Sequence, residues 1–168
     1  MAYLWRDNHG IYFDDNGSGE AILTIHGFAE SGMYWSRTGV SGALVDAGYR
    51  VVDIDMRGHG RSVPLGDDPG YNVESVGADF GAIADHLGLD RFHLLTHATG
   101  GFAALRYAMD SSHRLLSLMS TDTGAATSPN DEFCAPEYDG ALQSLKVPAP
   151  RPEKPPTRRT TAENMRLA

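Results

Sequence analysis

The sequence predicts an α/β protein with a mainly parallel sheet and helices on both of its faces. Short apolar runs recur along residues 1–123, and segments with a helical spacing of apolar residues lie between them. This alternation is typical of α/β folds, in which a helix connects one strand to the next parallel strand. A chain of 168 residues is long enough to bury a sizeable core in one domain.

Two strands are expected near the N-terminus. The first begins at Ile11, and an Asn-Gly-Ser-Gly turn at residues 16–19 follows it. The second strand is AILTIH at residues 21–26, an apolar run of the kind found in a sheet that is covered on both faces.

A helical stretch and a third strand come next. The stretch contains Trp35, Val40 and Leu44, and Gly48 is a typical helix stop. The run YRVVDIDM at residues 49–56 then predicts another buried strand, because most of its side chains are apolar.

The clearest helix lies within residues 72–89. Its apolar residues follow one another at intervals of three and four, as on one face of a helix. These residues are Val73, Val76, Phe80, Ile83 and Leu87. Asn72 is the expected N-cap of the helix, and Gly88 is its expected stop.

A strand, a helix and another strand complete the pattern. They are RFHLLTH at residues 91–97, GGFAALRYAM at residues 100–109 and LLSLMS at residues 115–120. The succession of elements therefore continues as strand, helix and strand to the end of the regular pattern.

The composition changes near residue 124, where turn formers, prolines and charges begin to dominate. Only the last residues look helical again, with Thr160 or Thr161 as the cap. Residues 146–168 hold six basic residues against two acidic ones, which we interpret as a solvated segment. We therefore expect a core over residues 1–123 and a linker, or the start of a lid, over residues 124–168.

Charge and composition exclude several classes of function. The net charge is −8, and an acidic main body argues against nucleic acid as a partner. No apolar stretch is long enough to span a membrane, and the N-terminus lacks the pattern of a secretion signal. The single cysteine, Cys134, excludes an internal disulfide and fits a reducing compartment, so we expect a cytoplasmic protein.

Three expected strands end in unusual residues. The strands run into His26-Gly27-Phe28, into Arg57–Ser62 (RGHGRS) and into residues 97–101, His-Ala-Thr-Gly-Gly. Ligands of α/β sheets bind at the carboxyl ends of the strands. The last segment has the form of a nucleophile elbow, a strained turn that exposes its central residue, here Ala98.

Together, HGF, DMRGHGRS and HATGG resemble motifs of the α/β-hydrolase superfamily, over roughly residues 10–123 and in the same order. The resemblance implies that Ala98 stands where the family has its nucleophile, a serine in the branch that Thr99 favours. It also implies that the backbone N–H groups of Phe28 and Thr99 form the oxyanion hole. Thr96 departs from the pattern, because the family usually has glycine there.

An alanine at position 98 has neither a proton to lose nor a lone pair to attack with. The resemblance therefore implies a chain that is inactive as written, although its backbone donors are retained. Alanine is also the replacement that an experimenter would choose to trap a substrate. An engineered exchange of serine for alanine is favoured over a natural pseudoenzyme.

A serine hydrolase also needs a histidine base and an acid that orients it. None of the seven histidines lies late enough in the chain to match the base of the family. Asp122 is the candidate acid, although a turn-capping role is favoured for it. Asp53 and Asp55 are interpreted as loop anchors near Arg57. No metal-ligand spacing and no nucleotide-binding motif stand out, so we expect no metal and no cofactor.

The family has eight strands, and at most six can be counted in this sequence. The resemblance implies a core that is truncated before its last two strands, with residues 124–168 as the start of the cap. The strand LLSLMS would then expose an unpaired apolar edge. We expect a complementary C-terminal chain or a second copy of the chain to cover it.

The function that the resemblance implies is hydrolysis of carboxylic esters or lactones, with a small ester or lactone as the substrate. One alternative is a non-catalytic protein that uses the same pocket to bind a small molecule. Another is a haloalkane dehalogenase whose nucleophilic aspartate has been replaced. That alternative is disfavoured because its family places tryptophan where this chain has Thr99.

Overall fold

The computed structural model describes residues 2–6, 8–62 and 72–123. Its strands are β1 (Ala2–Arg6), β2 (His9–Gly17), β3 (Ala21–Ile25), β4 (Arg50–Ile54), β5 (Phe92–His97) and β6 (Leu115–Thr121). Its helices are α1 (Met33–Arg37), α2 (Val40–Asp46), α3 (Val73–His86), α4 (Gly100–Ser111) and the short 3-10 helix η1 (Ser112–Arg114). The expectations for residues 124–168, including a cap at Thr160 or Thr161 and the thiol of Cys134, lie outside the described residues.

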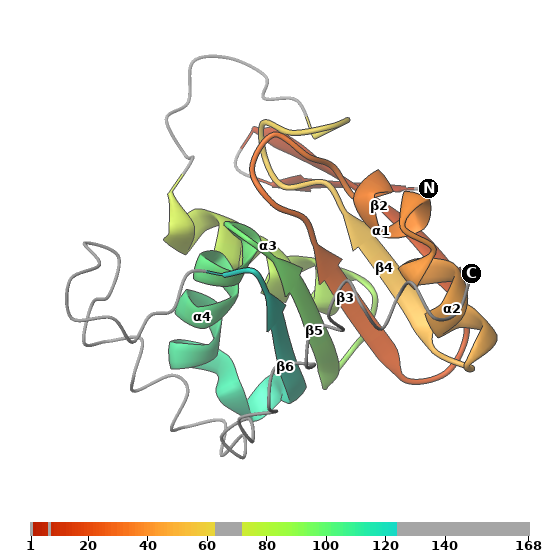
Figure 1. Cartoon of the computed structure of the whole chain (residues 1–168). Helices are drawn as coiled ribbons and strands as arrows, with labels where there is room; N and C mark the ends of the chain where they lie inside the picture. The colour runs from red at the N-terminus through yellow and green to blue at the C-terminus, as the bar shows by residue number, and fades with distance from the viewer. Residues whose placement is uncertain (1, 7, 63–71, 124–168) are drawn as a thin grey trace, which may run out of the picture.

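The strands form one mainly parallel sheet in the order β1-β2-β4-β3-β5-β6. Strands β4, β3, β5 and β6 are parallel, whereas β1 and β2 are antiparallel additions at one edge. The chain steps from β3 outward to β4 and then returns past β3 to β5, so right-handed crossovers place the connecting helices on opposite faces. Figure 1 shows α1 and α2 on one side of the sheet and α3 and α4 on the other. The predicted fold class is confirmed.

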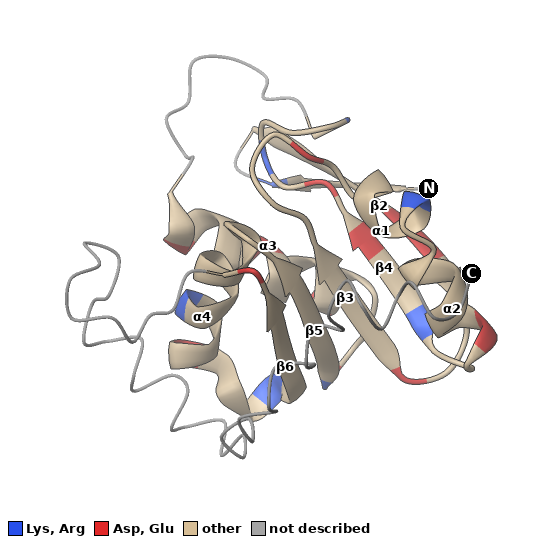
Figure 2. Cartoon of the chain, in the orientation of Figure 1, with Lys and Arg blue, Asp and Glu red and all other residues tan. Residues whose placement is uncertain are grey.

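The central strands are apolar because helices cover them on both faces. All five residues of β3 are buried, and Leu23 and Ile25 are completely inaccessible. Figure 2 shows β3 and β5 without charged residues, and charges gather on the helices and at the ends of strands. Because β3, β4 and β5 are parallel, their carboxyl ends meet at one edge of this covered sheet.

Helix α3 begins and ends where the sequence predicts. The side chain of Asn72 accepts a hydrogen bond from the N–H of Ser75 at 2.7 Å, and Gly88 has a positive φ of 68°. Phe80 and Ile83 are fully buried on the face toward the sheet. A side chain at Gly77 would lie 3.0 Å from the carbonyl oxygen of Ala103, so glycine allows α3 and α4 to pack closely.

Three features of the fold differ from a simple reading of the sequence. The N-terminal residues form an additional strand, β1, which pairs with β2. The two strands on either side of the Asn-Gly-Ser-Gly turn are not neighbours, because β4 lies between β2 and β3. The stretch around Trp35 is two short helices, separated at Gly39, whose φ of 80° cannot continue a helix.

Strand β6 forms the other edge of the sheet. Within the described part of the chain it pairs with β5 alone, and Met119 is 61% exposed. An apolar hollow of about 240 Å³ lies beside it, lined by Ile22, Leu44, Tyr49, His93, Leu94, Leu95, Ser117 and Met119. None of the described helices is long and apolar enough to cross a membrane.

A buried carboxylate ties α1 and α2 to the sheet. Asp53, on β4, accepts hydrogen bonds from the hydroxyl groups of Thr24 at 2.6 Å and Ser41 at 2.8 Å. The hydroxyl of Ser36 lies 3.3 Å from its second oxygen. Burial raises the pKa of Asp53, and the three hydroxyl donors oppose this effect in part.

Replacing Asp53 with asparagine is expected to make stability less dependent on pH. The raised pKa means that the folded protein retains this proton to a higher pH than the unfolded chain does. The wild-type free energy of unfolding therefore falls as pH rises above about 4, the pKa of an unfolded aspartate. In urea unfolding between about pH 4 and about pH 7, the free energy of unfolding of Asp53→Asn should rise relative to that of the wild type as pH rises. A difference that is constant with pH would contradict this prediction.

Candidate active site

The turn between β5 and α4 holds Ala98 in a left-handed conformation. Its φ is 46°, a region that alanine enters at a cost of about 1 kcal/mol. Three hydrogen bonds fix the turn. The N–H of Ala98 donates to the carbonyl of Thr121 at 2.8 Å, and the carbonyl of Ala98 accepts from the N–H of Gly101 and the hydroxyl of Thr123, both at 3.0 Å. The geometry is that of the turn the sequence predicts, with residue 98 in neither a regular strand nor a regular helix.

Glycines allow the ends of β3 and β5 to approach each other at this turn. A side chain at Gly100 would lie 2.5 Å from the carbonyl oxygen of His26 and 2.8 Å from a methyl group of Ile25. A side chain at Gly27 would lie 3.1 Å from the Cβ of Ala98. The loop that follows β3 is therefore in contact with the turn that follows β5.

Phe28 and Thr99, which the sequence predicts as the two backbone donors, line the same cavity. Its volume is about 530 Å³, and its other lining residues are Met56, Arg57, Gly58, His59, Asn72, Val73, Val76 and Ala103. The side chain of Phe28 is 76% exposed. Neither the N–H of Phe28 nor that of Thr99 donates to another described residue.

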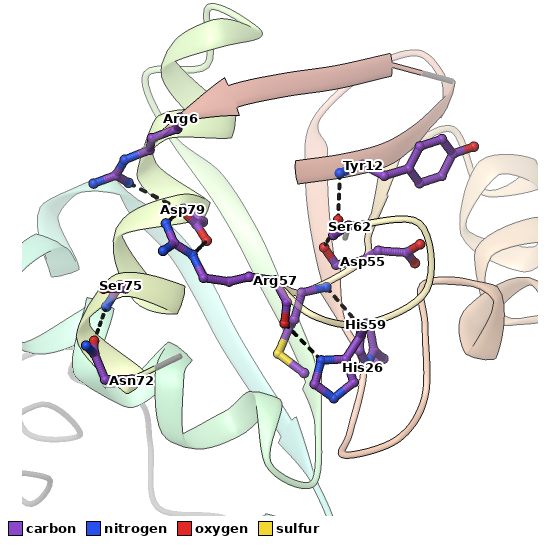
Figure 3. Close-up of polar contacts among 11 residues, drawn as sticks. Arg6, Tyr12, His26, Asp55, Arg57, His59, Ser62, Asn72, Ser75 and Asp79 are labelled. Atoms are coloured by element: carbon purple, nitrogen blue, oxygen red, sulfur yellow. Dashed lines mark hydrogen bonds and ion pairs between the residues drawn. The ribbon is translucent and has the colours of Figure 1, made fainter. Parts of the chain in front are cut away.

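His26 fastens the loop after β3 to the loop after β4. Its ring is completely buried, and its Nε2 accepts a hydrogen bond from the N–H of Met56 at 3.0 Å (Figure 3). Its Nδ1 therefore carries the proton and donates to the carbonyl of Gly27 at 2.7 Å. Burial lowers the pKa of His26, which favours this neutral, structural state.

The loop after β4 is fastened by its own polar residues. Asp55 accepts from the N–H groups of Gly32 at 2.6 Å and Arg61 at 2.7 Å. The hydroxyl of Ser62 donates to the carbonyl of Asp55 and accepts from the N–H of Tyr12, both at 2.7 Å (Figure 3). Asp53 and Asp55 are thus anchors, as the sequence indicates, but neither of them bonds the side chain of Arg57.

Arg57 pairs with Asp79, on α3. Its Nε lies 2.6 Å and its Nη2 2.7 Å from the two carboxylate oxygens of Asp79, and both side chains are almost fully buried (Figure 3). Arg6 of β1 approaches the same carboxylate at 3.5 Å. This pair links Arg57, which lines the cavity, to α3. Nothing in the sequence alone indicates Asp79 as its partner.

His59 is the one histidine among the described residues that lines the cavity. Its Nδ1 donates to the carbonyl of Arg57 at 3.0 Å, which leaves Nε2 as the nitrogen that can accept a proton. The edge of its ring contacts the side chain of Phe28, with 6.1 Å between ring centroids. His59 lies within the RGHGRS segment, and nothing in the sequence alone indicates its place at the cavity.

Asp122 lies beside the turn and is not among the residues that line the cavity. It has a positive φ of 53°, and its side chain is 84% exposed. Its Oδ2 is 3.8 Å from the Nδ1 of His97. The structure thus places Asp122 next to a histidine, and its role as the acid stays a prediction.

The sheet order and the turn after β5 define the class of protein. Residues 20–155 match the model of the alpha/beta hydrolase fold family, and the chain belongs to this family.

Several relatives within the family are enzymes by name. The chain is 35% identical over 143 residues to a protein named for carbamate hydrolysis, RutD of Variovorax paradoxus (strain S110), covering 84% of this chain and 52% of that protein. It is 36% identical over 144 residues to fluoroacetate dehalogenase of a Burkholderia species, covering 82% of this chain and 46% of the dehalogenase. The chain spans about half the length of these two relatives.

The solved structure of an esterase, EaEST from Exiguobacterium antarcticum, is also similar. It matches with a TM-score of 0.67 and 26% sequence identity, covering 75% of this chain and 47% of the esterase.

Proposed function

We propose that this chain carries the substrate-binding part of a serine-type hydrolase of carboxylic esters or lactones, with Ala98 at the position of the nucleophile. The observation that carries the proposal is the left-handed turn at Ala98, since the next residue, Thr99, lines one cavity together with Phe28. The esterase with a similar structure supports the reaction class.

In this proposal the carbonyl oxygen of the substrate accepts hydrogen bonds from the N–H groups of Phe28 and Thr99. Each donor of this kind stabilises the negative oxygen of the transition state by about 3 kcal/mol. The acyl part lies against the apolar wall formed by Met56, Val73 and Val76. The methyl group of Ala98 cannot attack the carbonyl carbon, so the chain binds an ester without cleaving it.

The remaining catalytic parts belong to the same proposal. Asp122 is the candidate acid, and a complementary C-terminal chain supplies the missing base. That chain, or a second copy of this chain, covers the edge of β6. Residues 124–168 form the start of the cap that selects the substrate. The protein acts in the cytoplasm, where its single cysteine stays reduced.

Two other functions fit the same geometry. A non-catalytic binding protein would have the same turn and cavity, and it requires alanine at position 98 of the natural gene. A dehalogenase is supported by the 36% identity with fluoroacetate dehalogenase. It is disfavoured by Thr99, which stands where dehalogenases of this family have tryptophan.

Binding of a short ester tests the proposed function. Ethyl butyrate added to the ¹⁵N-labelled full chain is expected to shift the amide resonances of Phe28 and Thr99. Val76→Trp should weaken this binding about tenfold or more, because the indole fills the cavity that buries the ligand.

Ala82→Trp is the matched control, because it adds the same indole to α3 outside the cavity, in the groove that faces α4. Its affinity for the ester should equal that of the parent chain. Ester-dependent shifts confined to that groove, or equal affinities for both tryptophan variants, would contradict the proposal.

A further inference from the structure

The carboxylate of Glu30 folds back onto the loop that carries Phe28. Its Oε2 accepts the N–H of Gly27 at 2.8 Å. The backbone turn over the same residues is weak, since the N–H of Glu30 lies 3.4 Å from the carbonyl of Gly27. Ala29, between them, has a positive φ of 58°. A charge-assisted bond from a side chain therefore holds this strained loop more firmly than its own backbone does.

The same carboxylate faces the residue before the turn at Ala98. Its Oε1 lies 4.0 Å from the Nε2 of His97. The ring of His97 stacks on Tyr34, with 4.6 Å between centroids and 8° between planes. Its Nδ1 lies 3.3 Å from the hydroxyl of Thr121, whose proton goes to the carbonyl of Thr96. The imidazole that Glu30 faces is thus fixed in place.

Glu30 therefore contacts both segments that carry the two free donors. Gly27 precedes Phe28 in the loop after β3, and His97 lies two residues before Thr99 in the turn after β5. An oxyanion hole requires both donors within about 3.1 Å of the same oxygen. Misplacement of one donor by about 1 Å can cost on the order of a hundredfold in rate.

We propose that Glu30 is a positioning residue, which sets the distance between the N–H groups of Phe28 and Thr99 by holding the Gly27 backbone against the end of β5. This inference rests on the proposed function, in which the two N–H groups bind the same substrate oxygen. If the carboxylate only stabilised the turn, its removal would lower stability and leave both kcat and KM of the folded protein unchanged.

Kinetics of the protein carrying Ala98→Ser, with the complementary C-terminal part that supplies the base present, test the proposal. Adding Glu30→Ala is expected to lower kcat for a p-nitrophenyl ester about tenfold with KM little changed. The reason is that the lost hydrogen bond to the charged carboxylate positions a donor and does not contact the substrate. Adding Glu30→Gln should keep most of kcat, because the amide oxygen still accepts the N–H of Gly27.

Glu20→Ala is the matched control. Glu20 lies 3.2 Å from the Nε2 of His93 and joins the same two strands, β3 and β5, at their opposite ends. It should leave kcat and KM unchanged. Equal kcat values for the Glu30→Ala and Glu20→Ala variants would overturn the proposal. A loss in Glu30→Gln as large as that in Glu30→Ala would overturn it as well.

Amide hydrogen exchange gives a readout that needs no catalysis. The N–H of Gly27 should exchange about tenfold faster in Glu30→Ala and at the parental rate in Glu30→Gln and Glu20→Ala. If Ala98→Ser shows no activity while the Gly27 exchange responds in this way, the proposed function is wrong, but Glu30 still holds the Gly27 backbone. Unchanged exchange in Glu30→Ala would show that Glu30 does not hold this backbone, whatever the activity.

Discussion

Replacing Ala98 with serine, in the protein that includes the complementary C-terminal part supplying the base, is expected to restore turnover by a factor on the order of a million, the usual loss on removing such a nucleophile. The turn and the cavity are in place, and in the proposed function Phe28 and Thr99 supply the backbone donors, so the hydroxyl group is the only part of the nucleophile that must be added. Hydrolysis of a p-nitrophenyl ester measures turnover, and labelling by a fluorophosphonate probe identifies the serine as the nucleophile. The serine oxygen bonds to phosphorus, fluoride leaves, and the serine proton passes to the base.

Ala29→Ser is the matched control for this experiment. Ala29 is another alanine with a positive φ, 58°, on the loop that faces the turn, although it is exposed whereas Ala98 is half-buried, so it adds the same hydroxyl in a similar backbone. It should not be labelled. A folded Ala98→Ser protein that remains unlabelled with the base-supplying part present would count against a serine hydrolase. Fluoride release from fluoroacetate by Ala98→Asp would instead assign the chain to the dehalogenases.

The parallel core could be predicted because its strands and helices each leave a local signal. Strand β3 is continuously apolar, and α3 shows regular spacing, a cap at Asn72 and a stop at Gly88. Strand β1 gave no such signal. Its exposed residues Tyr3 and Trp5 are aromatic, and its partly buried residues include the charged Arg6, so the alternation that marks a half-covered strand is absent.

The turn at Ala98 could be predicted for a different reason, because small residues and glycines follow a strand at a fixed spacing. The groups that fasten the site are not local. Asp79 lies 22 residues from Arg57, and Glu30 lies far from His97 in the sequence. Only the sheet order brings β3 next to β5 and α3 over the loop after β4. Sequence spacing alone cannot pair such residues.

The second large effect is expected for Asp79→Ala, which should lower the free energy of unfolding by about 3 kcal/mol. Two N–H groups of Arg57 bond this carboxylate at 2.6 and 2.7 Å, and both side chains are at most 3% exposed. Removing one member of a buried pair leaves a charge that water cannot reach. Urea unfolding of the full chain, followed by circular dichroism, measures the loss.

Asp85→Ala separates this effect from the removal of any aspartate on α3. Asp85 also pairs with an arginine, Arg114, at 2.6 Å, but its side chain is 69% exposed. An exposed pair contributes about 1 kcal/mol or less, since water and salt screen it. Asp79→Ala should therefore unfold at a much lower urea concentration than Asp85→Ala. Because Arg57 also lines the cavity, Asp79→Ala should weaken ester binding below the unfolding transition, whereas Asp85→Ala should not. Similar midpoints for the two variants would show that burial of the Arg57–Asp79 pair contributes little to the stability of this fold.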